Sequence, residues 1–424
     1  MTKAVTTAEV PGRPRYLEVL AVSHYFPPTL NAQSIQVSRL LANLPARVTV
    51  ACAEERIGPT DPSVLPNADA KIASVFRIPY GRTRLRRKID RTAERLGLAL
   101  WNIPDPQREW VAHLRRKLLP TLMRGSALPY DALITFGMPM SDHLLGLHIK
   151  RRHGVAWVAH FSDPWAGNAY TQENRVREWA AWQLERRVVE TADGVVFTSP
   201  ETLDFVMPRY PATWSEKAAV VLHSYDLTAF PAEAPPERNR YVIRSLGKFY
   251  GARSPIPLFE AIESIAAQHP DLLHDVDIEL IGYMDKVDMT PYPHSWRLVK
   301  CIAPVPYDES LRLMKRADCL LVIDAPAELS VFFPSKLVDY IGAGRHILAL
   351  TPPGATARIV RQLKGTVADV RDRNSVVQAV CDVLARRPKG CLEPPAAYSP
   401  EMTSALMMSV IRAALGRCPV RAGC

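Results

Sequence analysis

The chain has 424 residues, of which 47% are hydrophobic and 23% charged, a composition that excludes a disordered, collagen-like or low-complexity protein. At roughly 100–200 residues per domain, this length predicts two or three domains, each with its own core. The 53 lysines and arginines exceed the 43 aspartates and glutamates by ten, and this positive balance favours an anionic partner such as a nucleotide, a phospholipid or a nucleic acid.

Cysteine usage and hydropathy bear on the location of the protein. The seven cysteines include no C-x-x-C pair, so the sequence indicates neither a disulfide framework nor a zinc site and fits a reducing compartment. No run of about 18 apolar residues occurs, so no membrane-spanning helix is expected. We therefore expect a folded, cytoplasmic protein.

The first half of the chain alternates strand-length apolar runs with helical stretches. After a tail over residues 1–15, the apolar run Tyr16–Ser23 ends in a proline-rich loop, and a helix begins near Ser34. Two more helices are predicted at Ser141–Arg152 and Arg175–Thr191. The other predicted strands of this half are Arg47–Ala53, Ile72–Ile78, Ala132–Phe136, Val155–His160 and Gly194–Thr198. This alternation predicts a parallel sheet that is covered by helices on both faces.

The second half repeats this alternation after residues 226–240, whose proline, glutamate and alanine content is typical of a linker. The predicted strands are Tyr241–Leu246, Val276–Ile281, Arg297–Ile302, Cys319–Ile323 and His346–Leu350. The predicted helices are Pro257–Gln268, Tyr307–Arg316, Ser335–Ile341 and Ala355–Gln362. We predict an α/β fold of two doubly wound, Rossmann-like domains, residues 16–225 and 241–398, which face each other across a cleft. A last helix in residues 399–424, about Pro400–Leu415, is compatible with packing on either domain.

The segment Ser245–Arg253 (SLGKFYGAR) places two cations on a loop that follows a predicted strand. The strand ends at Gly247, and Lys248 and Arg253 stand five residues apart before a helix that opens with proline. Ligands of open α/β sheets bind beyond the carboxyl ends of the strands, so this loop can present its cations and backbone amides to a phosphate group. The alternative is a solvated basic turn.

The segment Phe333–Arg345 (FPSKLVDYIGAGR) has the start and stop signals of a helix that begins at Ser335. Lys336 and Asp339 lie three residues apart and therefore on one face of this helix. A lysine near a helix N-terminus can pair with a phosphate, and an aspartate can accept hydrogen bonds from two vicinal hydroxyls such as those of a ribose. The alternative is a surface ion pair between the two side chains.

His160 and Asp163 follow a predicted strand at the cleft end of the first domain. A polar pair at this place can orient a substrate hydroxyl or stabilise developing charge. The alternative is a histidine bonded to the backbone and an aspartate that caps the next turn. We take Glu178 and Glu185, on the helix Arg175–Thr191, as surface carboxylates.

Residues 81–125 form a basic stretch with twelve lysines or arginines against four acidic residues. Interleaved apolar side chains, among them Ile89, Trp101 and Trp110, give a helical surface that can rest on anionic lipid at the inner face of a membrane. The alternative is that these apolar residues are core and the arginines a solvated face. Nucleic acid is a poorer partner, because no RNA-binding or helix-turn-helix pattern accompanies the charge.

The phosphate loop and the short helix together resemble those of the retaining GT-B glycosyltransferases of family 4, also called group 1. In that family, a strand–Gly–Arg/Lys loop with a second cation five residues on holds the donor diphosphate, which matches Lys248 and Arg253. The resemblance continues through Gly282 and the segment Pro304–Ile323 to the PSKLVDY helix, where Asp339 is similar to the family glutamate that binds the nucleotide ribose.

In the first half, the loop SHYFPPTLNA resembles the acceptor-side loop of the family, and HFSDPW (His160–Trp165) resembles its loop with a catalytic histidine or aspartate. The resemblance implies a nucleotide-diphosphate sugar as donor substrate, no cofactor or metal ion, and a glycan, lipid-linked or small-molecule acceptor. It implies that the catalytic residues are His160 and Asp163, that Asn31 lies on the acceptor side, and that the donor is bound by Gly247, Lys248, Arg253, Ser335, Lys336 and Asp339.

Two departures from the family pattern keep other functions open. Val331 stands where the family has the first glutamate of a pair, with Glu328 nearby, and the N-terminal loop has Leu30, Asn31 and Ala32 in place of a glycine pair. One alternative is therefore a degenerate relative that binds a nucleotide sugar without transferring it. The other is a GT-B nucleotide-sugar epimerase, which needs carboxylates around the sugar.

Overall fold

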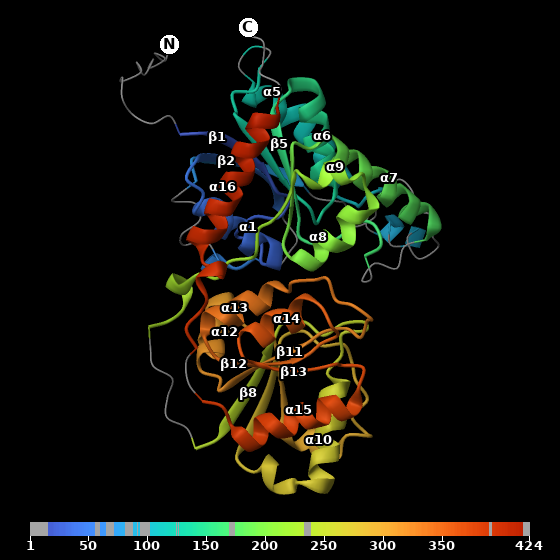
Figure 1. Cartoon of the computed structure of the whole chain (residues 1–424), viewed down its shortest axis with the longest axis vertical. Coiled ribbons are helices and arrows are strands. Elements are labelled where there is room, and N and C mark those ends of the chain that lie inside the picture. The colour runs from blue at the N-terminus through green and yellow to red at the C-terminus, as the bar shows by residue number, and fades with distance from the viewer. Residues whose placement is uncertain are drawn as a thin grey trace.

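The structure is a computed structural model. It describes residues 16–55, 60–64, 72–80, 88–90, 92–93, 102–123, 125, 127–168, 174–232, 239–389 and 392–418. The chain forms two α/β domains that lie one above the other along the long axis of the molecule (Figure 1). The predicted α/β, GT-B fold is confirmed, since each domain is a Rossmann-like unit with a parallel sheet.

The first domain is built on a seven-stranded sheet of order β3-β2-β1-β4-β5-β6-β7, in which every neighbouring pair is parallel. Most of its strands are short, fully buried apolar runs, as expected for strands that are covered on both faces. The strands are β1 (Glu18–Val22), β2 (Arg47–Glu55), β3 (Ser74–Tyr80), β4 (Ala132–Phe136), β5 (Ala156–Phe161), β6 (Gly194–Phe197) and β7 (Ala218–Val220).

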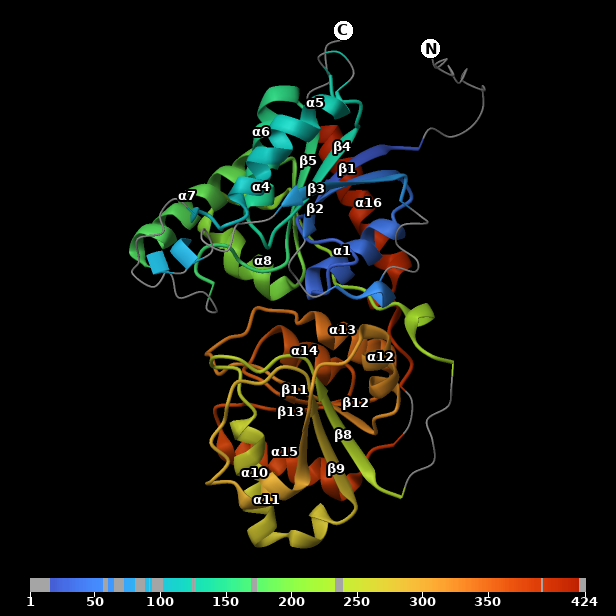
Figure 2. The ribbon, with the colours of Figure 1, turned by 180° about the vertical axis from the view of Figure 1, so that it is seen from behind.

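Helices cover both faces of this sheet (Figure 2). On one face, α1 (Ala32–Ala42) shares a core with the last helix, α16 (Pro400–Arg417), through Val37, Met407 and Ile411. The C-terminal helix therefore packs on the first domain, although the second domain precedes it in the chain. The remaining helices of the domain are α4 (Arg108–His113), a π-helical turn (Leu114–Leu118), α5 (Leu119–Leu122), α6 (Ser141–His153), α7 (Arg175–Thr191), α8 (Pro200–Val206) and α9 (Ala212–Ser215).

The basic stretch 81–125 is described in part, mainly over residues 102–123. In that part the apolar side chains belong to the core: Trp110, Leu114 and Leu118 are buried against the sheet. The cations between them, Arg115, Arg116 and Lys117, are exposed, which is the alternative of a solvated face. Ile89 is exposed, while Trp101 lies outside the described residues. No helix among the described residues is both long and apolar enough to cross a membrane.

The second domain is built on a six-stranded parallel sheet of order β10-β9-β8-β11-β12-β13. Its strands are β8 (Tyr241–Leu246), β9 (Val276–Ile281), β10 (Val299–Ile302), β11 (Cys319–Ile323), β12 (His346–Leu350) and β13 (Thr366–Ala368). Its helices are α10 (Ile256–Gln268), α11 (Pro293–Leu298), α12 (Tyr307–Lys315), α13 (Ser335–Ala343), α14 (Ala355–Gln362) and α15 (Arg373–Arg386). One core lies under α10 and α15 and the other under α12, α13 and α14, so the sheet is again covered on both faces.

Candidate functional site

The carboxyl ends of the strands in the two sheets point toward each other, and their loops form the surface between the domains (Figures 1 and 2). The first domain contributes the start of α1 and the loops after β4, β5 and β6. The second contributes the loops after β8, β11 and β12 and the start of α13. Side chains of the two domains touch here: Gln36 Nε2 donates to Ser335 Oγ over 3.3 Å.

Two glycines shape the loop that follows β8. Gly247 and Gly282 have φ angles of 131° and 134°, which L side chains rarely adopt. A Cβ atom on Gly282 would lie 1.8 Å from the carbonyl oxygen of Gly247, so the backbones of the two strand ends touch. A Cβ on Gly247 would instead lie 3.6 Å from Cδ of Lys336. Gly247 therefore lies in contact with Lys336, the second residue of α13.

Lys336 is a desolvated cation at the N-terminal end of a helix. Burial, and to a lesser extent the charge of Arg253, lower its pKa from 10.5 to about 7, against the opposing effect of Asp324. Its ammonium lies 5.8 Å from the ring centroid of Phe249, and no described residue accepts a hydrogen bond from it. The neighbouring Lys248 is exposed on the loop after β8. The structure thus gathers the predicted residues Gly247, Arg253, Ser335 and Lys336 at one place.

Arg253 is held by a buried carboxylate that the sequence did not single out. Its Nη2 lies 3.3 Å from Oδ1 of Asp324, whose side chain is completely buried. The other oxygen of Asp324 accepts a hydrogen bond of 2.8 Å from the Thr351 hydroxyl. Asp324 follows β11 and Thr351 follows β12, so two neighbouring strand ends fix the position of the guanidinium.

Across the cleft, Asp163 is a carboxylate of the first domain whose pKa is affected by the charge of Arg253. Burial raises the pKa of Asp163 to about 6, and the charge of Arg253 opposes this rise. His160, the other predicted catalytic residue, is only 5% exposed and packs 5.0 Å from the ring of Phe136. Burial lowers the pKa of His160 to about 4, so its imidazole is neutral at pH 7. Asp163 is half-buried whereas His160 is buried, so the side chain of Asp163 is the more accessible of the two.

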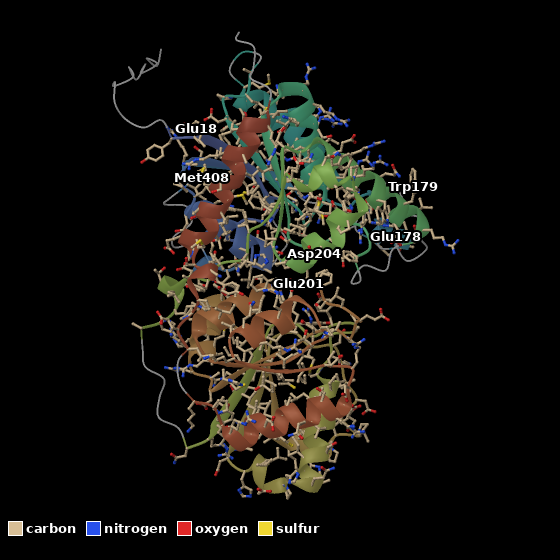
Figure 3. All side chains as sticks on the ribbon, viewed as in Figure 1. Glu18, Glu178, Trp179, Glu201, Asp204 and Met408 are labelled. Carbon is tan, nitrogen blue, oxygen red and sulfur yellow. The ribbon has the colours of Figure 1, made fainter. Side chains whose placement is uncertain are left out.

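Glu185 on α7 is not a surface carboxylate, so that expectation is wrong. Its side chain is fully buried, and Oε2 accepts hydrogen bonds from the amides of Trp165 and Ala166 over 3.1 and 2.9 Å. The hydroxyl of Tyr210 donates to Oε1 over 2.6 Å. Glu185 thus fixes the loop that carries Asp163. Glu178 on the same helix is exposed, as expected (Figure 3).

Asp339 lies in a buried cluster between the domains. Nη1 of Arg39, on α1, donates to its Oδ1 over 2.8 Å, and both side chains are at least 93% buried. The hydroxyl of Tyr307 lies 3.1 Å from each carboxylate oxygen. The alternative of a surface pair with Lys336 is therefore wrong. The ribose contact stays a prediction, and it requires Arg39 and Tyr307 to withdraw from the carboxylate.

The segment around Val331 is docked against the first domain. Val331 is buried, and its carbonyl accepts hydrogen bonds of 2.8 Å from the hydroxyls of both Ser199 and Thr202. Nearby, Glu201 receives Nε of Arg358 over 2.6 Å and Nη2 over 3.1 Å. Figure 3 places Glu201 on the edge of the first domain that faces the second.

The first domain also offers a cavity of about 270 Å³ beside the Asp163 loop. Pro164 and Trp165 line it from that loop, and Met138 and Asp105 line it from two others. Asn31 caps α1, because its Oδ1 accepts the amide of Ser34 over 2.7 Å, and its place on the acceptor side stays a prediction. The cavity is thus a concave feature beside the loop that carries Asp163.

Comparison with known proteins agrees with this architecture. The model of the glycosyl transferase 4-like domain matches residues 31–212. No curated protein sequence matches the chain. Among solved structures, HepE of Anabaena in complex with UDP and glucose is similar over 95% of this chain and 98% of that one, with a TM-score of 0.56 and 12% identity.

Two other solved structures are similar over nearly the whole chain. Sucrose-phosphate synthase from Thermosynechococcus elongatus has a TM-score of 0.58 and 14% identity, with 94% of this chain and 95% of that one covered. A putative UDP-N-acetylglucosamine 2-epimerase from Listeria monocytogenes has a TM-score of 0.55 and 11% identity, with 94% and 96% covered. At these identities the likeness establishes the fold that the chains share.

Proposed function

Because residues 31–212 of this chain belong to the glycosyl transferase 4-like domain family and the whole chain has the GT-B fold, we propose that this glycosyltransferase moves a sugar from a nucleotide-diphosphate donor to a hydroxyl acceptor. The observation that carries the proposal is the meeting of Arg253 and Lys336 over Gly247 at the end of β8. Two cations at one strand end are suited to a diphosphate, the group that leaves in such a transfer.

The cations account for how the leaving group is stabilised. When the bond between the anomeric carbon and the β-phosphate breaks, one more negative charge develops on the diphosphate. Arg253, Lys336 and the exposed Lys248 can balance this charge, as can the amides at the start of α13. HepE and other proteins of this fold bind UDP, so we propose a nucleoside diphosphate sugar, with UDP and GDP as the first nucleotides to test.

The acceptor reaches the donor from the first domain in this proposal. Asp163, whose pKa lies at about 6, is ionised at neutral pH and can orient or deprotonate an acceptor hydroxyl. The cavity beside Pro164 and Trp165 is the place for the remainder of the acceptor, a glycan, a lipid-linked sugar or a small molecule. His160 remains a predicted catalytic residue that acts beside Asp163, in its neutral form.

We further propose that transfer retains the anomeric configuration and needs no metal ion, as the resemblance to family 4 implies. Peripheral contact with the inner face of a membrane through residues 81–125 remains a prediction for the case of a lipid-linked acceptor.

One experiment separates the transferase from its two alternatives. UDP- and GDP-sugars are incubated with the protein, with and without a panel of glycan and lipid-linked acceptors, and followed by proton and phosphorus NMR. A transferase releases the nucleoside diphosphate and gives a new glycoside, whose anomeric coupling reports retention. An epimerase gives a second nucleotide sugar without releasing the diphosphate. A degenerate binder broadens the ligand signals and changes nothing, which would refute the proposed activity.

A further inference from the structure

We infer that Asp324 is a positioning residue for the nucleotide diphosphate: together with Thr351 it holds the guanidinium of Arg253 in the geometry that binds phosphate. This inference rests on the proposed function of the same cleft. It assigns a role to a carboxylate that itself never meets the ligand.

Asp324 is too deeply buried to contact a ligand itself and can influence binding only through other residues, first of all Arg253. Its side chain is fully buried behind Arg253, whose own side chain is 17% exposed. A carboxylate in this position pays a desolvation penalty unless its oxygens are matched by a cation or hydrogen-bond donors. Both oxygens are matched here, Oδ1 by Arg253 at 3.3 Å and Oδ2 by the Thr351 hydroxyl at 2.8 Å.

The geometry explains why a carboxylate is useful next to an anion site. Without an anchor, a long arginine side chain samples several rotamers, and ordering it upon binding costs affinity. Asp324 and Thr351 directly follow the adjacent parallel strands β11 and β12, so the sheet fixes their positions. The guanidinium that they hold is therefore ordered before the ligand binds. The same carboxylate favours the charged form of Lys336, so it supports the second cation of the site as well.

Electrostatic repulsion between Asp324 and the diphosphate would have the opposite effect on nucleotide affinity, so the two effects can be told apart. A carboxylate near a diphosphate repels it, so electrostatics alone predicts that Asp324→Asn binds a nucleotide more tightly. Positioning predicts weaker binding, because the amide keeps the shape but loses the charge-assisted contact to Arg253. It also predicts that the effect depends on Arg253 being present.

The test is a calorimetric titration of UDP, GDP, ADP, CDP and dTDP into the full-length chain. We expect Asp324→Asn to weaken binding by roughly 10-fold or more, the size expected when a hydrogen bond between charged groups is lost. Thr351→Val, which keeps the charge and removes the hydroxyl, should cause a smaller loss in the same direction. In the Arg253→Ala background, Asp324→Asn should cause no loss or a modest gain.

Asp318→Asn is the matched control. Asp318 precedes β11 as Asp324 follows it, and its Oδ2 accepts the amide of Val242 over 2.8 Å at the far end of the sheet from the cleft. We expect nucleotide affinity to stay unchanged in this variant, whatever its melting temperature.

Each other result overturns the inference in a distinguishable way. Unchanged or tighter binding by Asp324→Asn refutes positioning and leaves the proposed function intact. An equal loss with and without Arg253 shows that Asp324 serves the fold. If Asp324→Asn does not fold, Thr351→Val in the two backgrounds decides between the same outcomes. A wild-type chain that binds none of UDP, GDP, ADP, CDP and dTDP refutes the proposed function and this inference with it.

Discussion

The buried ion pair between Arg39 and Asp339 allows a sharp prediction for the stability of the interdomain contact. Arg39 donates from Nη1 to Asp339 over 2.8 Å and to the carbonyl of Ser224 over 2.9 Å, and from Nη2 to the hydroxyl of Tyr307. The exposed fractions of the Arg39 and Asp339 side chains are 7% and 5%. Replacing Arg39 by Met keeps the apolar stem and leaves Asp339 buried with Tyr307 as its donor.

The magnitude follows from this burial. Removing one partner of a buried pair costs about 3–5 kcal/mol, because the remaining charge loses its compensation. We expect about 3 kcal/mol for Arg39→Met, since Tyr307 still donates to the carboxylate. For a domain of this size, this corresponds to a fall in the melting temperature of roughly 6–12 °C. The double variant Arg39→Met/Asp339→Leu should be more stable than Arg39→Met alone, because no unpaired charge stays buried.

Differential scanning calorimetry of Arg39→Met, Asp339→Leu and the double variant measures these values. Arg47→Met serves as the control, since Arg47 lies 3.7 Å from Glu18 with side chains 67% and 35% exposed. An exposed pair of this kind contributes about 0–1 kcal/mol, so its melting temperature should shift little. A shift in Arg39→Met no larger than that of Arg47→Met would refute the argument. So would additive losses in the double variant.

Four further predictions concern the cleft. Arg253→Ala should weaken binding of UDP or GDP by about 1.5–3 kcal/mol in calorimetry, and Lys248→Ala is measured in the same way. The pKa of Lys336 is about 7 in the folded chain, far below the value of 10.5 in the unfolded chain. Between these two pH values the unfolded state binds more protons than the folded state, so the free energy of unfolding rises with pH. Lys336 therefore destabilises the fold most at pH 7 and below. Lys336→Met should therefore raise the melting temperature at pH 7 and weaken nucleotide binding. The transfer rate should fall as pH drops through about 6, where Asp163 takes up a proton. The variant Asp163→Asn should transfer more slowly and should not show this fall in rate at acid pH. Transfer should persist in excess EDTA, because cations of the chain balance the diphosphate.

Each of these has an outcome that contradicts it. Unchanged calorimetric affinity would remove Arg253 or Lys248 from the site. A melting temperature of Lys336→Met below that of the wild type would contradict the assignment of a desolvated ammonium. If the rate of Asp163→Asn still falls at acid pH, the fall is due to protonation of another group. Loss of activity with EDTA and recovery with Mg²⁺ or Mn²⁺ would show that a metal ion takes part.

The sequence was most informative for strands buried on both faces. Continuous apolar runs such as Ala132–Phe136 and Cys319–Ile323 coincide with β4 and β11, because a strand covered by helices on both sides has no polar face. The strands β7 and β13 have only three residues each, too few for a pattern, and were not predicted. The elements expected from the sequence do not include helix α15, although its buried positions Val376, Val380 and Val383 follow helical spacing.

The candidate site was predictable only where its residues are close in sequence. The glycine and cations of the loop after β8 could be recognised together. The pairing of Arg39 with Asp339 joins residues 300 positions apart. Nothing in the sequence around Arg39 indicates that this arginine is buried. Asp324 and Glu185 likewise become visible as buried carboxylates only after the sheet brings Arg253 and the Trp165 loop to them.

The most direct test of the central claim is the release of nucleoside diphosphate from UDP- and GDP-sugars in the presence of an acceptor panel, compared between the wild-type chain and Arg253→Ala/Lys336→Met. We predict that the wild type releases the diphosphate from at least one donor, with the sugar recovered on an acceptor. The double variant should lose this activity by more than about 100-fold, since two charged contacts to the leaving group are removed. Equal release by the two proteins would contradict the claim that these cations stabilise the leaving diphosphate.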